Sequence, residues 1–458
     1  MNIEVVVLAA GQGSRMKSDL PKVLHPIAGK PMLAHVLDSA RQVDAKALHV
    51  VVGHGADKVK AAFDGQNDIQ WALQAEQLGT GHAVKMALDN LQADGVTLIL
   101  YGDVPLIQSA TLQALVDIAK AEHVGLLTVT MDDPMGYGRI VRDSNGNVKA
   151  IVEHKDATPE QLSIDECNTG ILAVPTAKLH QWLPTLSNDN AQGEYYLTDV
   201  IAMSVNDGIR VETLQPEFAE ETYGVNNRAQ QAELERWYQA RLVDELMTKG
   251  VTVLDPARLD IRPGVAGQGV EVGRDVVIDT NVILEGSVVL GDGVRIEANC
   301  IIRNSAIAAG TVIRAFSHVE DANVQQACEV GPYARLRPGA QLESGAKVGN
   351  FCEVKKSIVG EGSKVNHLTY IGDAVIGKGA NIGAGTITCN YDGVNKFKTE
   401  IGDGAFIGSN SSLVAPVKVG DFATVGAGST ITKDVDADKL AVARGKQVNL
   451  TWQRPTKK

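Results

Sequence analysis

The chain has 458 residues, of which 44% are apolar, so it is long enough for two or three domains and apolar enough to give each a core. Its formal net charge of minus 12 argues against a surface built to bind nucleic acid or an anionic membrane, because both partners need clustered positive charge.

The cysteines and the N-terminus indicate the compartment. The five cysteines are odd in number, widely spaced and free of any C-x-x-C motif, which argues against a disulfide framework or a zinc site. We expect them to be small buried residues in a reducing cytoplasm: Cys167, Cys300, Cys328, Cys352 and Cys389. Residues 1–10 carry Glu4 and no positively charged leader, and no apolar run approaches membrane-spanning length. We therefore expect a soluble cytoplasmic protein.

The first half of the chain alternates short apolar runs with helical patterns. The expected strands are 5–10, 47–53 and 96–103, and the expected helices are 32–43 and 79–91. Such alternation predicts a parallel sheet with helices on both of its faces.

A glycine loop, LAAGQGSRMKSDLPKVL, follows the first of these strands over residues 8–24. The dinucleotide fingerprint does not fit, because Met16 stands where its third glycine is needed, and the Walker spacing fails as well. Glycines at the carboxyl end of a buried strand still indicate a phosphate site. Asp103 ends a later strand, and its position alone fits a turn residue and a metal ligand about equally well.

Residues 226–250 predict a helix that links two domains. Asn227 and Gln230 resemble an N-terminal cap, and Gly250 is placed to end the helix. The apolar residues recur at helical spacing: Leu234, Tyr238, Leu242 and Leu246.

After about residue 250, aliphatic residues recur six apart, as in the run Ile278, Leu284, Leu290, Ile296 and Ile302. This period is the hexapeptide repeat of a parallel β-helix, in which each short strand points one aliphatic side chain inward. The repeat stops over residues 388–399 and then resumes, which predicts a loop that leaves the solenoid at one edge.

The glycine loop with Lys22, the later QAEQLGTGHA and YGD, and the repeat containing HLTYIGDAVIGKGANIGAGTITCNYDG resemble a family of bifunctional bacterial enzymes. These enzymes acetylate glucosamine-1-phosphate and then uridylylate N-acetylglucosamine-1-phosphate. The resemblance covers essentially the whole chain, with Ser14 where the family commonly has Thr. It implies an α/β chain: a Rossmann-like nucleotidyltransferase domain over 1–227, a linker helix over 228–250, and an acetyltransferase domain over 251–458 that is a left-handed parallel β-helix with a C-terminal tail.

The resemblance implies that the first domain binds UTP and the sugar nucleotide, with Mg²⁺ on Asp103 and Asn226 and with Arg15 as a catalytic cation. Asn227 is better spaced than Asn226 to cap the helix, which leaves Asn226 free. The implied residues for nucleotide and sugar are Leu8, Ala9, Ala10, Gly11, Lys22, Gln74, Gly79, Thr80, Tyr101, Gly102, Asp103, Gly138, Glu153, Asn168 and Asn226. Within this set, Gln74, Gly79 and Thr80 would read the uracil, and Gly138, Glu153 and Asn168 would hold the N-acetylglucosamine.

The second reaction needs a base, because an amine is largely protonated near neutral pH, and histidine suits that task. The resemblance assigns it to His367. It places the amino sugar phosphate on Arg337, Lys355, Tyr370 and Asn381. It places acetyl-CoA on Ala384, Asn390, Tyr391, Ser409, Ala427 and Arg444. The chain has no G-x-S-x-G motif, so we expect direct transfer without an acyl-enzyme.

The implied product feeds peptidoglycan and lipopolysaccharide precursors. The implied assembly is a homotrimer, with no nucleic acid or membrane partner. One alternative is a single-activity sugar nucleotidyltransferase whose β-helix has no catalytic role. That alternative does not explain why His367, Lys355, Arg337 and the Asn390-Tyr391 loop occur together. The other is a non-enzymatic scaffold, which the retention of Arg15, Lys22 and Asp103 disfavours.

Overall fold

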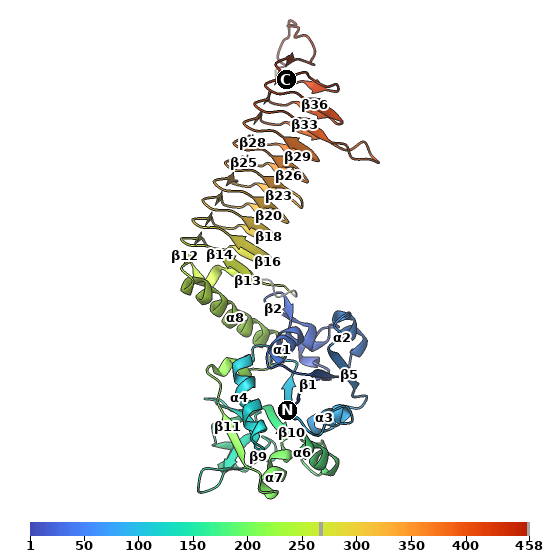
Figure 1. The fold of residues 1–458 in the computed structure, drawn as a ribbon, viewed down its shortest axis with the longest axis vertical. Coiled ribbons are helices and arrows are strands. Elements are labelled where there is room, and N and C mark those ends of the chain that lie inside the picture. Colours follow the sequence, from blue (N-terminus) through green and yellow to red (C-terminus); the bar gives the residue numbers. More distant parts are fainter. Residues whose placement is uncertain (265–268, 456–458) are drawn as a thin grey trace. The chain divides into compact units, whose positions relative to one another are not determined.

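The computed structural model describes residues 1–264 and 269–455. The chain forms two compact units, Met1–Tyr238 and Gln239–Lys458, which divide within helix α8, Arg228–Thr248 (Figure 1). The predicted domain limits at 227 and 250 fall at the two ends of this helix and remain a prediction.

The first unit is built on a mixed sheet with the strand order β11-β7-β10-β6-β1-β4-β5. These strands are β1 (Ile3–Ala9), β4 (Ala47–Val52), β5 (Ile69–Leu73), β6 (Val96–Tyr101), β7 (Val124–Thr130), β10 (Glu166–Pro175) and β11 (Val211–Leu214). Every residue of β1 is buried, and β1 pairs in parallel with both β4 and β6. The predicted strands of the first half are therefore confirmed.

Helices cover both faces of this sheet. Successive side chains of a strand point to opposite faces, and accordingly Val5 and Val7 lie in one apolar cluster while Val6 and Leu8 lie in another. Residues of α1 and α4 complete the first cluster, and residues of α3, α6 and α7 complete the second. The bounds are α1 (Met32–Arg41), α2 (Ala56–Ala62), α3 (Thr80–Leu88), α4 (Ser109–Lys120), α5 (Pro159–Leu162), α6 (Thr176–Trp182) and α7 (Asp199–Asn206). The Rossmann-like layering is confirmed.

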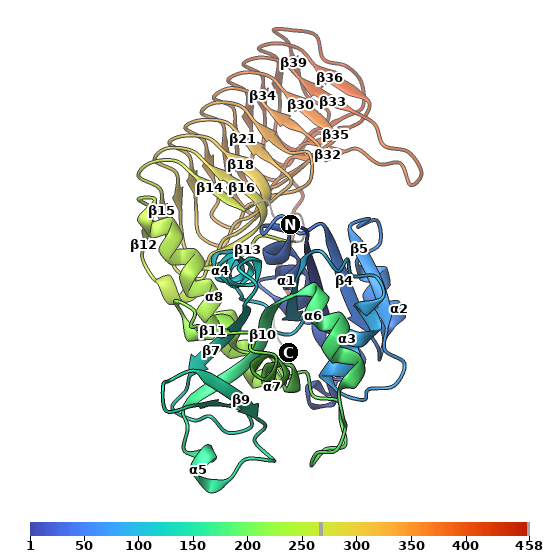
Figure 2. The ribbon, with the colours of Figure 1, turned by 60° about the horizontal axis from the view of Figure 1, so that its bottom comes forward.

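The sheet differs from a purely parallel one at β10, which runs antiparallel to both β6 and β7. Between β7 and β10 the chain forms the hairpin of β8 (Arg139–Arg142) and β9 (Val148–Val152) and the single-turn helix α5. Figure 2 shows β9 and α5 extending away from the main sheet. A parallel return needs a crossover over one face of the sheet, and this excursion provides none.

Helix α8 confirms the predicted linking helix. The Oδ1 atom of Asn227 accepts hydrogen bonds from the backbone N–H groups of Ala229 and Gln230, at 2.9 and 3.0 Å. Gly250 ends the segment with a φ of 93°, in the left-handed region that favours glycine.

The second unit is a parallel β-helix. Its strands stack coil upon coil into parallel sheets (Figure 1). Ile278 pairs with Ile296, and Val348 pairs with Val365, so a coil takes 17 or 18 residues, or about three hexapeptides. These four aliphatic side chains are buried in one continuous core, which confirms the six-residue period.

The predicted interruption is confirmed as a loop over 390–398, between β32 (Ile387–Cys389) and β33 (Thr399–Ile401). An antiparallel bridge joins Tyr391 to Lys396 within it. The five cysteines are free thiols, four of them buried as predicted and Cys389 half-buried. In residues 1–264 and 269–455, no helix has the length and apolar character needed to cross a bilayer.

Candidate functional site

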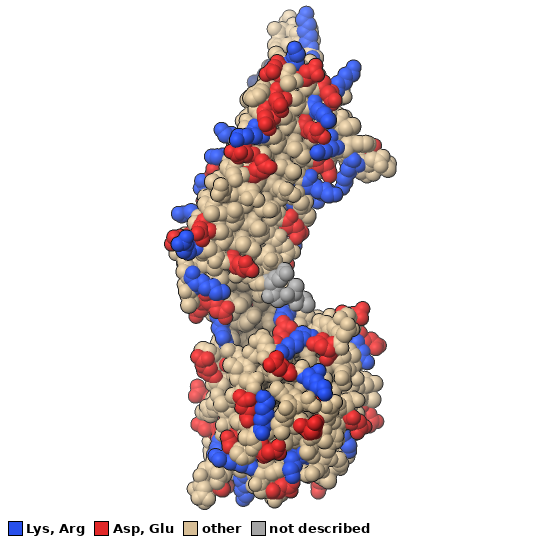
Figure 3. Space-filling model, in the orientation of Figure 1, with Lys and Arg blue, Asp and Glu red and all other residues tan. Residues whose placement is uncertain are grey.

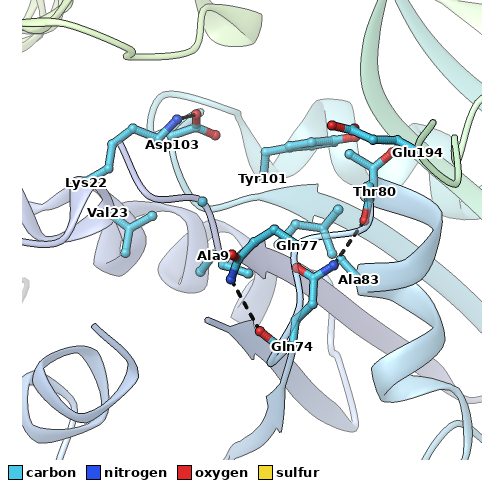
Figure 4. Close-up of a pocket in the computed structure, with 14 residues that line it drawn as sticks. Ala9, Lys22, Val23, Gln74, Gln77, Thr80, Ala83, Tyr101, Asp103 and Glu194 are labelled. Atoms are coloured by element: carbon cyan, nitrogen blue, oxygen red, sulfur yellow. Dashed lines mark hydrogen bonds and ion pairs between the residues drawn. The ribbon is translucent and has the colours of Figure 1, made fainter. Parts of the chain in front are cut away.

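A pocket in the first unit lies at the carboxyl ends of β1 and β6 and at the start of α3 (Figure 4). Its lining contains most of the residues that the resemblance assigns to the nucleotide: Leu8, Ala9, Ala10, Gly11, Lys22, Gln74, Gly79, Thr80, Tyr101 and Asp103. The sequence analysis missed four members of the lining, namely Val23, Gln77, Ala83 and Glu194. Strands far apart in sequence thus present one concave surface.

The glycine loop turns without forming a regular helix. It leads into a three-residue 3₁₀ turn, Ser14–Met16. Gly13 has a φ of 63°, and a Cβ built on it would lie 2.6 Å from the Cβ of Lys22. Glycine therefore allows the Lys22 side chain to lie against the loop. Arg15 is exposed on this turn and does not line the pocket.

Lys22 joins the two predicted metal ligands. Its Nζ contacts a carboxylate oxygen of Asp103 and lies 3.2 Å from the Oδ1 of Asn226. A backbone hydrogen bond of 2.9 Å from the N–H of Val225 to the carbonyl of Asp103 keeps these residues together. Two side-chain oxygens from distant parts of the chain thus converge on one cation.

These oxygens could hold a divalent metal ion that arrives with a nucleotide. Mg²⁺ is commonly bound through one or two carboxylates together with substrate phosphates and water. Within residues 1–264 and 269–455, no cluster of three or more His, Cys, Asp or Glu side chains is arranged to hold a metal ion. Asp103 and Asn226 would therefore supply part of the coordination, and phosphate oxygens and water the rest.

The predicted sugar residues lie together: Gly138 directly precedes β8, Glu153 directly follows β9, and Asn168 lies on β10. The backbone N–H of Asn168 donates to the carbonyl of Gly138 at 2.9 Å. A Cβ on Gly138 would lie 3.5 Å from a carboxylate oxygen of Glu153. The Thr198 hydroxyl donates to Glu153 at 3.1 Å, while burial raises the pKa of this carboxyl above its ordinary value. The three sugar residues form one polar cluster.

Tyr101 is the last residue of strand β6 and lies beside this cluster, and Gly102 follows it directly. A Cβ on Gly170 would lie 2.5 Å from the Tyr101 ring, so glycine is required for the ring to occupy this position. Burial raises the pKa of Tyr101 above its ordinary value, and the carboxylates of Glu153 and Asp103 raise it further. The phenol therefore stays neutral and remains a hydrogen-bond donor. The N–H of Gly102 donates to the carbonyl of Leu8 at 2.9 Å, which joins β6 to β1.

In the second unit, four predicted residues form a column with His367 at one end. The N–H of Gly385 donates to the carbonyl of His367, that of Asn410 to Ala384, and that of Gly428 to Ser409. The column is continued by Ala427, whose carbonyl accepts from Nη1 of Arg444 at 2.5 Å. His367 and the predicted acetyl-CoA residues Ala384, Ser409, Ala427 and Arg444 thus lie along one corner of successive coils.

The His367 ring is held by a neighbour in the preceding coil. Its Nδ1 lies 2.9 Å from the Oδ1 of Asn350, and the two residues pair between β25 (Lys347–Asn350) and β28 (Lys364–His367). An amide oxygen only accepts, so this contact favours the hydrogen on Nδ1, which in the neutral ring leaves the lone pair on Nε2. This tautomer is the one that accepts a proton at Nε2.

Three cations of the second unit, Arg337, Lys355 and Lys396, lie close together. Arg337 forms an ion pair of 2.7 Å with Glu353 on β26 (Glu353–Lys355), and Tyr370 begins β29 (Tyr370–Gly372), beside Glu353. The side-chain contact with Lys396 lowers the pKa of Lys355 below its ordinary value, and the charge of Lys396 adds to the effect. Figure 3 shows Lys and Arg side chains gathered beside the base of the loop 390–398. This cluster suits a phosphate dianion.

The remaining predicted residues are divided between the loop and another sheet. The Asn390 side chain is buried and its Nδ2 donates to Asp373 at 2.6 Å, whereas Tyr391 is exposed. Asn381 lies on β31 (Asn381–Ile382), in the sheet that contains β28. The other sheet contains Lys355 on β26 and Tyr370 on β29, and Arg337 directly follows its strand β23 (Arg335–Leu336). One chain therefore does not bring Asn381 onto the same sheet as the cations.

The sequence analysis missed Asn350 and Lys396. Each stands beside a predicted residue only because of the coil register or the fold of the loop. Asn350 precedes His367 by 17 residues, one coil length, so the repeat itself carried a signal that would have identified it. No comparable spacing pointed to Lys396.

Comparison with known proteins gives full-length matches. Residues 5–159 match the MobA-like NTP transferase domain, and residues 269–304 and 398–433 match the bacterial transferase hexapeptide repeats. A protein of Cellvibrio japonicus (strain Ueda107), named Bifunctional protein GlmU, is 60% identical over 457 residues, 100% of each chain. Proteins of the same name from Marinobacter nauticus and Stutzerimonas stutzeri are 57% and 58% identical, covering 99% and 100% of both chains respectively.

Proposed function

The chain belongs to the family of bifunctional GlmU proteins, and on that premise we propose how its residues divide the two reactions of UDP-N-acetylglucosamine synthesis. The enzyme transfers an acetyl group from acetyl-CoA to glucosamine-1-phosphate. It then transfers a uridylyl group from UTP to N-acetylglucosamine-1-phosphate and releases pyrophosphate. The observation that carries this conclusion is the 56–60% identity to GlmU proteins along essentially the whole chain.

For uridylyl transfer, we assign the triphosphate of UTP to the glycine loop and Lys22. The sugar phosphate oxygen attacks the α-phosphorus, so the protein needs to position both substrates and stabilise charge. Lys22 and Arg15 would supply positive charge, with Arg15 requiring a movement of its exposed turn toward the pocket. Asp103 and Asn226 would hold Mg²⁺, which when bound neutralises charge on the phosphates.

For the base and sugar, we assign uracil to Gln74, Gly79 and Thr80. The acetylated sugar would contact Gly138, Glu153 and Asn168. The proximity of the last three residues supports this assignment. Tyr101 would close the space between base and sugar as a neutral donor, since its pKa is raised.

For acetyl transfer, we propose that Nε2 of His367 takes the proton from the attacking amine of glucosamine-1-phosphate. The nitrogen attacks the thioester carbonyl and coenzyme A leaves as the thiol. The contact of Nδ1 with Asn350 supports this role, because it leaves Nε2 unprotonated. Arg337 and Lys355, joined by Lys396, would bind the sugar phosphate, and Tyr370 would add a hydrogen bond.

We assign the arm of acetyl-CoA to the corner formed by Ala384, Ser409 and Ala427. Small side chains there leave the surface open to an extended ligand that ends at His367. Asn390 and Tyr391 would contact the coenzyme from the loop, and Arg444 from beyond Ala427.

We further propose that the active assembly is a homotrimer. The match of residues 269–304 and 398–433 to bacterial transferase hexapeptide repeats supports association of this unit into an oligomer. The cytoplasm is the proposed location, and the free thiols fit a reducing compartment.

The test of this division is the variant Asp103→Ala. We expect it to abolish pyrophosphate release from UTP and to leave thiol release from acetyl-CoA unchanged. Loss of both activities in protein that remains folded would contradict the assignment of Asp103 to the first site alone.

A further inference from the structure

The amide of Gln74 has a fixed orientation. Its side chain is 3% exposed, and Nε2 lies 3.1 Å from the carbonyl oxygen of Gly79 and 3.1 Å from Nδ1 of His82. A backbone carbonyl oxygen only accepts, so the amide atom that faces Gly79 must be the nitrogen. The orientation of Gln74 follows from this contact.

Both hydrogens of Nε2 then have acceptors. One is directed to Gly79, and the other to Nδ1 of His82, which accepts only when it carries no hydrogen. This leaves Oε1 as the side-chain atom of Gln74 with capacity to bind a ligand. In the part of the chain that the structure describes, no hydrogen bond to this oxygen is found, and Gln74 lines the nucleotide pocket (Figure 4).

His82 itself lies outside that pocket. It lies in the first turn of α3 and lines a separate pocket with Leu78, Met86 and Tyr195. The His82 and Tyr195 ring centroids are 6.4 Å apart. His82 therefore acts on the nucleotide pocket through Gln74, with which it shares a hydrogen bond.

We propose that His82 is a positioning residue that sets the base preference of the uridylyl site, an inference that rests on the proposed reading of uracil by Gln74. Uracil presents an N–H donor at N3, whereas cytosine presents an acceptor at the same position. With Nε2 held by Gly79 and His82, Gln74 presents only an acceptor. Oε1 then attracts the uracil N3–H and repels the cytosine N3. Loss of the His82 acceptor removes one of the two contacts that hold Nε2, so only the Gly79 carbonyl still opposes a turn of the amide that would present Nε2 to cytosine.

The test compares kcat/KM for UTP and CTP in three variants of the full chain. His82→Phe keeps a flat ring and removes the acceptor, and His82→Asn places Oδ1 near the former position of Nδ1. We expect His82→Phe to lower the UTP:CTP ratio about tenfold, the weight of roughly one hydrogen bond. His82→Asn should stay within about twofold of the wild-type ratio, since it keeps the acceptor. Thermal unfolding followed by circular dichroism reports whether each variant is folded.

The third variant, Gln74→Leu, separates this inference from the proposed function. It removes Oε1, and we expect it to lower the ratio as well. A lowered ratio in Gln74→Leu with a wild-type ratio in His82→Phe would overturn the role of His82 alone. A wild-type ratio in Gln74→Leu would overturn the reading of uracil by Gln74, and the inference with it. An equal fall in both His82 variants would show that the ring shape matters rather than its acceptor, which also overturns the proposal.

Discussion

Asn350 determines which nitrogen of His367 is free to act as a base. The two side chains meet because one coil of the β-helix places residue 350 directly before residue 367 in the stack. The distance of 2.9 Å from Nδ1 to Oδ1 fixes the ring and the tautomer together. A general base must present a lone pair toward its proton, so this contact would prepare His367 for its proposed role without touching the substrate.

We predict that Asn350→Ala lowers kcat for acetyl transfer about 10- to 100-fold, because the ring loses its orientation and its preferred tautomer. KM for glucosamine-1-phosphate should change little. Asn350→Asp keeps an acceptor for Nδ1, so it should retain more of the activity than Asn350→Ala. A large rise in KM with unchanged kcat in the alanine variant would contradict this role.

For single residues, the sequence predicts contacts only where the partner lies close by in the chain. The choice of Asn227 over Asn226 as the cap of α8 required only spacing, and the structure confirms it. Lys396 was missed because its contact with Lys355 depends on how the loop folds back. Arg15 stands in the predicted loop, but the direction of the turn leaves it exposed.

Helix α8 contributes to the cores of both units. Leu234 packs in an apolar cluster of the first unit, whereas Val243 and Leu246 belong to the core of the β-helix. The side chain of Gln239 is 2% exposed, donates to the carbonyl of Ile261 at 2.8 Å, and accepts from its N–H at 2.7 Å. A solenoid needs its end coil covered, and this half of α8 provides that cover.

We predict that Gln239→Ala destabilises the β-helix by about 2 to 4 kcal/mol, since it leaves a buried N–H and a buried carbonyl of Ile261 without this partner. Thermal unfolding followed by circular dichroism measures the loss. Gln325→Ala, an exposed glutamine on the solenoid, is the matched control and should leave the midpoint nearly unchanged. Equal midpoints for the two variants would show that α8 does not stabilise the first coil through Gln239.

Strands could be predicted from the sequence where the spacing of aliphatic residues repeats. The buried positions of the β-helix follow from a six-residue spacing that needs no knowledge of long-range contacts. The direction of β10 did not follow, because it depends on the hairpin β8–β9 and the short α5 that precede it. Apolar content alone does not distinguish a parallel strand from an antiparallel one within a covered sheet.

The whole molecule consists of two units with separate cores and separate candidate sites. Each unit contains its own apolar clusters, and the residues of each proposed reaction fall within one unit. Most of the residues predicted for the nucleotide line one pocket, whereas the residues predicted for the second site lie on two sheets and a loop. On the proposed trimer, only the second site would be shared between copies.

Sedimentation equilibrium should accordingly give three times the mass of the 48.6 kDa chain. Dissociation by dilution should remove acetyl transfer before it removes uridylyl transfer, because only the former site would be shared. A monomer that persists and retains acetyl transfer would contradict the trimer and the sharing of its site.

The most direct test of the central claim is thiol release from acetyl-CoA with glucosamine-1-phosphate, measured for wild type and His367→Ala side by side. Pyrophosphate release from UTP with N-acetylglucosamine-1-phosphate is measured on the same preparations. If the two reactions use two separate sites, wild type releases thiol rapidly and His367→Ala nearly loses thiol release. Both proteins then release pyrophosphate at equal rates. Absence of thiol release from folded wild type that still consumes UTP would contradict the account and leave a single-activity nucleotidyltransferase.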